Sequence, residues 1–256
     1  MENQVTQLLK AMVKPDYTAC SYAFMQDGKI VCADAIGVID KINNQPITTD
    51  CTFNVCSISK IYCTVCVMQL VDEGLIQLED KVADILPEFT MKDERYKDIT
   101  VRMCLDHSSG LPGTQWKHFS VSTTSKFDYY SEVLNYLSNS TLKADPGTYS
   151  TYCNDGFTLA EMVVSKVRNM PYEDVLKKYI TEKIGANSTN TTYTIHSDYP
   201  LVSEGKKPKE YFPIQGAGGI TTSMIDLCKF GQLFLEPNSI ISEKSKALMA
   251  KSWGTT

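Results

Sequence analysis

The sequence predicts an α/β (α+β) fold, in which an antiparallel sheet lies beside a mainly helical lobe. Two strand-like runs, about 18–25 and 29–36, flank Gln26-Asp27-Gly28. Asp-Gly between such runs favours a hairpin, because the tight turn needs residues that accept a positive φ. Helical patterns then dominate from about residue 57 to residue 236. A hairpin followed by many helices is the element order of an α+β domain.

Composition and charge are those of a soluble globular protein. The 256 residues can bury a sizeable core in one large domain or two intimate lobes, and 43% of them are hydrophobic. The mean hydropathy is -0.20, as in ordinary soluble proteins. A net charge of -5 without a basic run argues against a nucleic-acid-binding role. The start Met1-Glu2-Asn3-Gln4 lacks a signal-type apolar core, which predicts a cytoplasmic protein without a membrane anchor.

The first two helical patterns differ in character. Residues 4–13 carry their apolar side chains on one side, which predicts a short amphipathic helix. The stretch from Ile61 to Val71 is almost uninterruptedly apolar and ends at Asp72-Glu73-Gly74. A run of this length predicts a buried helix and is too short to span a bilayer.

Later helices follow from local patterns and stop signals. Residues 78–87 predict a short helix stopped by Pro87, and residues 100–107 predict a helix that ends in the turn at 108–112. Further helical patterns cover about 128–138, 155–168, 171–184 and 222–236, whereas 139–154 and 186–221 are polar, turn-rich connections.

The nine cysteines are numerous for a chain of this size. Without a secretory signal they are interpreted as reduced thiols and small core residues. Cys63-Thr64-Val65-Cys66 has the spacing of a metal or redox motif, but no second cysteine pair or histidine pair accompanies it. The motif also lies in the apolar helix, so core packing is the preferred interpretation.

Ser57-Ile58-Ser59-Lys60 places a hydroxyl and an amine one helical turn apart. Residues three apart share a helix face, so the two groups are expected to meet. Serine needs an adjacent base to act as a nucleophile, and a lysine serves where burial leaves it partly neutral. The pattern alone is weak, because a capping serine and a solvated lysine are common. At the start of a buried helix, however, free amides and the helix dipole favour negative charge on the serine oxygen.

Tyr152 and Asn154 form the second candidate constellation, after Pro146-Gly147-Thr148. Side chains two apart in an extended segment face the same way, so both can face one cleft. A phenol near a lysine can share its proton and act as a general acid or base. The amide of Asn154 could bind a substrate carbonyl and hold Lys60. Alone, this stretch would be interpreted as a surface turn with a packed tyrosine.

Together these motifs resemble the serine β-lactamase and penicillin-binding-protein family, in particular its class C β-lactamase, esterase and D-aminopeptidase branch. The similar segments occur in order over almost the whole chain: 28–31, 35–37, 52–60, 68–74, 86–89, 105–112, 146–148, 152–157, 217–222, 226–227 and 230–231. The resemblance implies a β-lactamase/transpeptidase-like fold and a serine hydrolase that needs no metal or other cofactor.

The resemblance also implies a role for each site residue. Ser57 is then the acylated nucleophile, and its backbone amide is one donor of the oxyanion hole. Lys60 activates Ser57, Tyr152 passes a proton to the leaving group and later activates water, and Asn154 orients the substrate amide.

Histidine could suggest a different mechanism, a Ser-His-Asp triad with His107 as the base. The resemblance instead implies a structural role for His107 in its turn. His118 and His196 have no catalytic context, and no Gly-x-Ser-x-Gly elbow frames any serine.

The pattern departs from the family towards its end. Members carry a Lys-Thr-Gly or His-x-Gly motif on a late strand that donates the second oxyanion amide, and nothing after Gly219 fits it. The expected organisation is one C-terminally truncated domain over 1–256 that lacks the last strands of its sheet. It comprises about 1–56 for the N-terminal helix and hairpin, about 57–216 for the helical lobe and about 217–256 for a return segment. A second chain or self-association would supply the missing strands and cover an unpaired sheet edge.

The sequence therefore predicts a serine hydrolase that forms a Ser57 acyl-enzyme on an amide or ester. The substrate is a small molecule or peptide: a β-lactam, a D-amino-acid peptide or a small ester, among which the fold does not choose. The alternative is an impaired or inactive fragment that acts as a penicillin-binding or sensor module. The loss of one oxyanion donor costs roughly 10²–10³ in rate, which favours weak activity of the chain alone.

Overall fold

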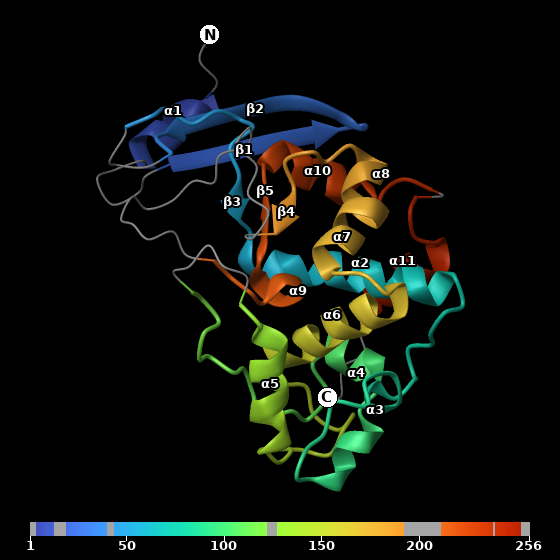
Figure 1. The fold of residues 1–256 in the computed structure, drawn as a ribbon. Coiled ribbons are helices and arrows are strands. Elements are labelled where there is room, and N and C mark those ends of the chain that lie inside the picture. Colours follow the sequence, from blue (N-terminus) through green and yellow to red (C-terminus); the bar gives the residue numbers. More distant parts are fainter. Residues whose placement is uncertain are drawn as a thin grey trace.

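The computed structural model describes residues 4–12, 19–39, 44–121, 127–191, 211–237 and 239–251. In these ranges a hairpin layer lies above a body of helices, with a small second sheet between them (Figure 1). The mixed helix-and-sheet architecture with antiparallel strands is the one that the sequence predicts. His196 lies outside the described residues.

The hairpin consists of β1 (Ala19–Gln26) and β2 (Lys29–Gly37), which pair antiparallel. Asp27 and Gly28 connect them with φ values of 50° and 73°. Two successive positive φ values are typical of a type I′ turn, so the predicted Asp-Gly hairpin is confirmed. Helix α1 (Gln4–Met12) packs against β2, and α10 (Met224–Gln232) packs against β1.

The second sheet is a feature that the sequence did not indicate. Its order is β3 (Phe53–Asn54), β5 (Ile220–Thr222) and β4 (Asn190–Thr191), all antiparallel. The prediction of 186–221 as a connection throughout was therefore wrong for its described ends. Strands of two or three residues are too short to show an alternating pattern. The sheet ties residues near 53 to residues near 220, just ahead of the main buried helix.

Two long helices form the centre of the molecule, α2 (Ser59–Asp72) and α6 (Asn154–Arg168), which pack against each other (Figure 1). Most of α2 is buried on all sides, as its uninterrupted apolar sequence predicts. Tyr62 of α2 stacks on Phe230 of α10, with ring centroids 3.5 Å apart. This contact joins the helical body to the helix beneath the hairpin.

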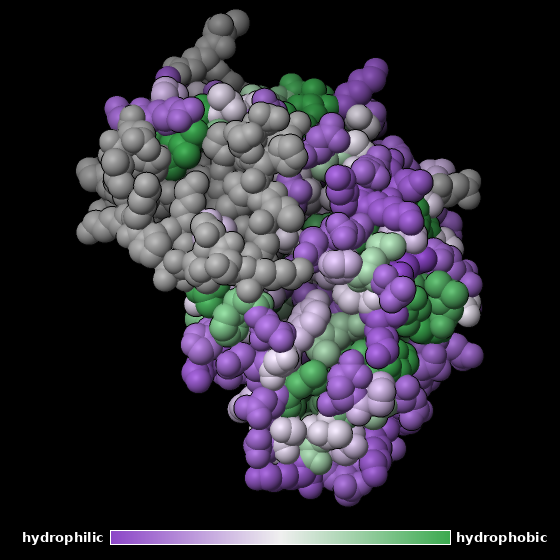
Figure 2. All heavy atoms as spheres, in the orientation of Figure 1, coloured by the Kyte–Doolittle hydropathy of each residue, from purple (hydrophilic) through white to green (hydrophobic). Residues whose placement is uncertain are grey.

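The remaining helices are short. They are α3 (Val82–Ile85), α4 (Val101–Leu105), α5 (Tyr129–Ser138), α7 (Tyr172–Leu176), α8 (Glu182–Ile184), α9 (Gln215–Gly218) and α11 (Glu243–Ala250), with 3-10 turns at Cys56–Ile58 and Glu94–Asp98. The predicted helix over 171–184 is interrupted by a π-helical turn, Lys177–Thr181. Mainly hydrophilic residues cover the face of the helical body in Figure 2, with small hydrophobic areas between them. The apolar sides of the helices thus largely face inward.

Candidate active site

Ser57 lies in the 3-10 turn Cys56–Ile58, two residues before α2 begins at Ser59. The sequence predicts Ser57 at the N-terminus of the buried helix, and the structure places it there in a short 3-10 turn that leads into α2. The turn is fixed by Asn54, whose Oδ1 accepts the Cys56 N–H at 3.0 Å and whose Nδ2 donates to the Gly218 carbonyl at 2.9 Å. The 3-10 turn continues into α2, so Ser57 and Lys60 still share one side.

Lys60 is buried, and its amine meets three acceptors. Nζ lies 2.7 Å from Asn154 Oδ1, 2.6 Å from the Ala217 carbonyl oxygen and 3.4 Å from Ser57 Oγ. An ammonium group has three hydrogens, so these three acceptors can use all of them. Each acceptor is uncharged. The amine is thus fixed between α6, α9 and the nucleophile turn.

Tyr152 completes the group. Its hydroxyl is 2.6 Å from Ser57 Oγ, and its ring centroid is 4.7 Å from Lys60 Nζ. Cys153 has extended backbone angles (φ -144°, ψ 119°), and Asn154 is the first residue of α6. Because the backbone is extended at Cys153, the side chains of Tyr152 and Asn154 both point into the same site. The structure brings together all four residues that the two sequence motifs singled out.

His107 supports the tyrosine segment and does not contact the nucleophile. Its Nδ1 accepts the Cys153 N–H at 3.2 Å, and its ring centroid lies 4.5 Å from that of Tyr152. Burial lowers the pKa of His107, and the nearby Lys60 charge lowers it further. A neutral imidazole can accept this backbone hydrogen bond, whereas an imidazolium cannot. The contacts of His107 are those of a structural residue. His118 belongs to neither sequence motif, and its Nδ1 lies 3.5 Å from Glu132 Oε2.

Three further residues lie in segments that resemble the family, but no role in the site was predicted for them. Ala217 contributes only its backbone carbonyl, and Ser59 Oγ accepts the Ile220 N–H at 3.0 Å, which ties α2 to β5. Asp155 is buried next to Asn154 and accepts the Gln115 N–H at 2.8 Å. Burial raises the pKa of Asp155 to about 7. These contacts attach the backbone at Ile220 to α2 and the backbone at Gln115 to α6.

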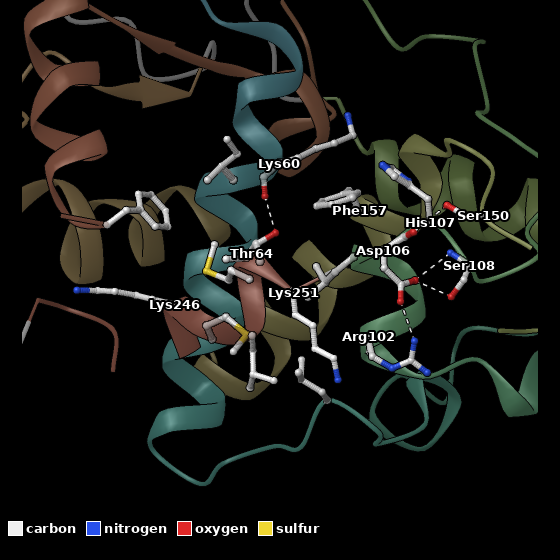
Figure 3. A pocket seen from close by; sticks show the side chains of 18 residues that line it. Lys60, Thr64, Arg102, Asp106, His107, Ser108, Ser150, Phe157, Lys246 and Lys251 are labelled. Atoms are coloured by element: carbon white, nitrogen blue, oxygen red, sulfur yellow. Dashed lines mark hydrogen bonds and ion pairs between the residues drawn. The ribbon is translucent and has the colours of Figure 1, made fainter. Parts of the chain in front are cut away.

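A cavity of about 690 Å³ opens beside Lys60. Figure 3 shows Lys60, Phe157 and His107 around its upper part, and Arg102, Asp106 and Ser108 joined by hydrogen bonds at one side. Helix α11 contributes the apolar side chains of Leu248, Met249 and Ala250 to the lining. A cavity of this size could hold a small ligand.

The cysteine motif belongs to the core. Cys63 and Cys66 are fully buried in α2, and both are free thiols. Burial raises the pKa of Cys66 to about 12, which keeps this thiol protonated. In the part of the chain that the structure describes, no group of histidine, cysteine, aspartate or glutamate side chains could hold a metal ion. Nor does any described helix have the length and apolar character that crossing a bilayer requires.

A serine hydroxyl within reach of an amine and a phenol, at the start of a buried helix, is a constellation suited to nucleophilic acyl transfer. The chain belongs to the β-lactamase family, whose sequence model matches residues 5–256. The predicted resemblance and the predicted fold class are thereby confirmed.

Relatives in this family share a low identity with the chain. Penicillin-binding protein 4* of Bacillus subtilis is 25% identical over 244 residues, which cover 86% of this chain and 53% of that protein. The chain thus spans about half the length of this relative.

Solved structures resemble the fold closely. The octameric penicillin-binding protein homologue from Pyrococcus abyssi superimposes with a TM-score of 0.78 at 23% identity, covering 97% of this chain and 59% of the other. EstCE1, a hydrolase with promiscuous acyltransferase activity, superimposes with a TM-score of 0.76 at 20% identity. The match covers 96% of this chain and 75% of EstCE1. At these identities the likeness concerns the fold.

Proposed function

We propose that the chain is a serine hydrolase of the β-lactamase/penicillin-binding-protein type that works through a Ser57 acyl-enzyme. The observation that carries the proposal is the contact of Ser57 Oγ with both Tyr152 OH and Lys60 Nζ, at 2.6 Å and 3.4 Å. In its unprotonated form, either group can take the serine proton as Oγ attacks a carbonyl carbon. Family membership supports the same chemistry.

The proposed cycle has two steps. In acylation, the Ser57 Oγ–carbon bond forms, the bond to the leaving nitrogen or oxygen breaks, and Tyr152 returns a proton to the leaving group. In deacylation, Tyr152 takes a proton from water and the hydroxide attacks the acyl carbon. The Ser57 Oγ–carbon bond then breaks, the acid product leaves, and Tyr152 returns the proton to Ser57 Oγ. Lys60 activates Ser57 and stays fixed by Asn154 and Ala217, while Asn154 also orients the substrate amide.

The substrate class is an amide or ester that fits beside Ser57. Three candidates have support from relatives or solved structures. The penicillin-binding protein of Bacillus subtilis supports a β-lactam, and the hydrolase EstCE1 supports a small ester. The D-alanyl-D-alanine-carboxypeptidase/endopeptidase AmpH of Escherichia coli, 24% identical over 199 residues, supports a D-amino-acid peptide. The fold does not choose among them. If the acyl adduct forms and is not released, the chain acts instead as a penicillin-binding or sensor module.

A labelling experiment tests the nucleophile. A fluorophosphonate or a fluorescent penicillin is expected to label the wild type at Ser57, with the adduct located by mass spectrometry. The S57A variant should lose the label, whereas S150A should keep it, because the Ser150 hydroxyl donates to the Asp106 carbonyl oxygen and takes no part in the proposed reaction. An adduct at Cys56 or Cys153 would show that the proposed nucleophile is wrong. Turnover of nitrocefin or a p-nitrophenyl ester then separates an enzyme from a module that is only acylated.

Three further predictions stay open. They are a cytoplasmic location, the C-terminal truncation, and a second chain or self-association that completes the sheet. Sedimentation of the purified chain over a range of concentrations would test the last of them.

A further inference from the structure

Helix α6 reaches the proposed active site at two points. Its first residue, Asn154, binds Lys60 directly. Two turns later, Glu161 is completely buried, and its Oε2 accepts the Gly216 N–H at 2.6 Å. Gly216 belongs to α9, which packs against both α2 and α6 (Figure 1). The next residue of α9, Ala217, provides the carbonyl that accepts from Lys60.

The contact between Glu161 and α9 is close. A Cβ atom at Gly216 would lie 3.1 Å from Glu161 Oε2 and 3.0 Å from Cys63 Sγ, which leaves little room for a side chain. The other carboxylate oxygen, Oε1, accepts the Tyr130 hydroxyl at 2.5 Å. A buried carboxylate is stable only when such donors replace water. The Gly216 N–H and the Tyr130 hydroxyl thus hold one oxygen each, which fixes the carboxyl group between α9 and α5.

Helix α9 is held on both sides of Ala217. Glu161 binds the amide before it, and Asn54 Nδ2 donates to the Gly218 carbonyl after it at 2.9 Å. Asn54 also fixes the turn that contains Ser57, through the Cys56 N–H. The position of the Ala217 carbonyl is therefore determined relative to both α6 and the nucleophile turn.

We propose that Glu161 is a positioning residue for the reaction. By holding Gly216, Glu161 keeps the Ala217 carbonyl oxygen within hydrogen-bond distance of Lys60 Nζ. The position of the amine relative to Ser57 Oγ depends on this contact. This inference rests on the proposed function, since it assigns Glu161 to the same site. A displacement of about 1 Å in such a group can cost on the order of 10²-fold in rate.

Two variants separate positioning from plain stability. E161A removes the acceptor for Gly216, whereas Y130F removes the other donor to the same carboxylate and leaves the Gly216 bond in place. We expect E161A to slow acylation of Ser57 at least 10-fold with little change in the concentration of probe needed for half-saturation. The acylation rate of Y130F should lie within about twofold of the wild-type rate. E161Q keeps an acceptor of the same size and should recover most of the rate.

The probe for these measurements is the fluorescent penicillin, and rates are compared at a temperature where thermal melting shows each variant folded. The inference is overturned if the acylation rate falls equally in E161A and Y130F. It is also overturned if E161A changes only the probe concentration needed for half-saturation. If the wild type is not labelled at all, the proposed function fails. The positioning role is then decided by a crystal structure of E161A. Lys60 Nζ still within hydrogen-bond distance of the Ala217 oxygen contradicts it, and separation of the two atoms supports it.

Discussion

Tyr152 makes contacts of two kinds that can be changed separately. Its hydroxyl meets Ser57 Oγ, while its ring lies against His107 and beneath the Lys60 amine. The side chain is about half exposed. Replacing the hydroxyl alone therefore alters the chemistry of the site with little effect on packing.

Y152F is expected to lower kcat/KM for the substrate that the labelling experiments identify by roughly 10²–10⁴-fold, because the general acid and base is lost. The melting temperature should stay close to that of the wild type. Y149F is the control, since Tyr149 is a neighbouring exposed tyrosine. Steady-state kinetics and thermal melting of both variants check the prediction. Activity of Y152F near the wild-type value would remove Tyr152 from the proposed mechanism.

At the residue level, the site residues that the sequence predicts share two features. Their chemistry lies in the side chain, and each stands at a short, fixed sequence distance from a partner residue. Ser57 and Lys60, and Tyr152 and Asn154, form two such pairs, and the structure brings them together. The Ala217 carbonyl could not be predicted, because every residue has one. Glu161 had a weak signal, since it lies four residues after Phe157 and three before Val164 on the buried side of α6.

At the level of elements, turn chemistry explains why the hairpin could be predicted and several short elements could not. Asp27-Gly28 requires a backbone geometry that few other residue pairs accept, so it is visible in the sequence. Helix α9 and strand β5 are held by partners elsewhere in the chain, namely Glu161, Asn54 and Ser59. Helix α11 begins at Glu243, after the N-cap residue Ser242. The Ser242 hydroxyl accepts the Ser245 N–H, and this cap was the only clear start signal of the helix.

Two glycines of different conformation give a test at this scale. Gly28 has a φ of +73° in the hairpin turn, whereas Gly231 lies within α10 with nothing near the position of a Cβ. G28A should lower the free energy of unfolding by about 1 kcal/mol, because alanine is strained at positive φ. G231A should raise it by up to about 1 kcal/mol, because alanine favours helix. Urea denaturation of the two variants should give changes of opposite sign. The same sign in both would contradict the turn geometry.

For the whole molecule, the resemblance covered nearly the entire chain, and this is why the fold class could be predicted. The small β3-β5-β4 sheet could not, since it joins three segments that are far apart in the sequence. The proposed division at about residues 56 and 216 stays a prediction. In the structure, α9 packs against α2, and β5 pairs with β3.

Stability of the molecule should depend on pH through Asp155. Burial raises its pKa to about 7, above the usual value near 4 in an unfolded chain. Between these two values the folded protein holds a proton that the unfolded chain has released. Stability is therefore lost as the pH rises through this window, at about 1.4 kcal/mol per pH unit.

The variant D155N removes this titration and keeps an oxygen to accept the Gln115 N–H. The stability of the wild type relative to D155N should fall between about pH 5 and pH 7 and then level off. D84N, at an exposed aspartate of α3, provides the control. Chemical denaturation at several pH values gives the comparison. A constant difference between the wild type and D155N would show that Asp155 does not titrate in this range.

The contacts of Lys60 also bear on how the protein becomes competent during synthesis. Its two short hydrogen bonds go to residues 94 and 157 positions later in the chain. During translation, Ser57 and Tyr152 leave the ribosomal exit tunnel before Ala217 does. The nascent polypeptide consequently exposes its reactive alcohol long before the amine acquires its last acceptor. Reactivity towards an acylating probe should appear late in translation, only once the stretch around Gly216 has emerged.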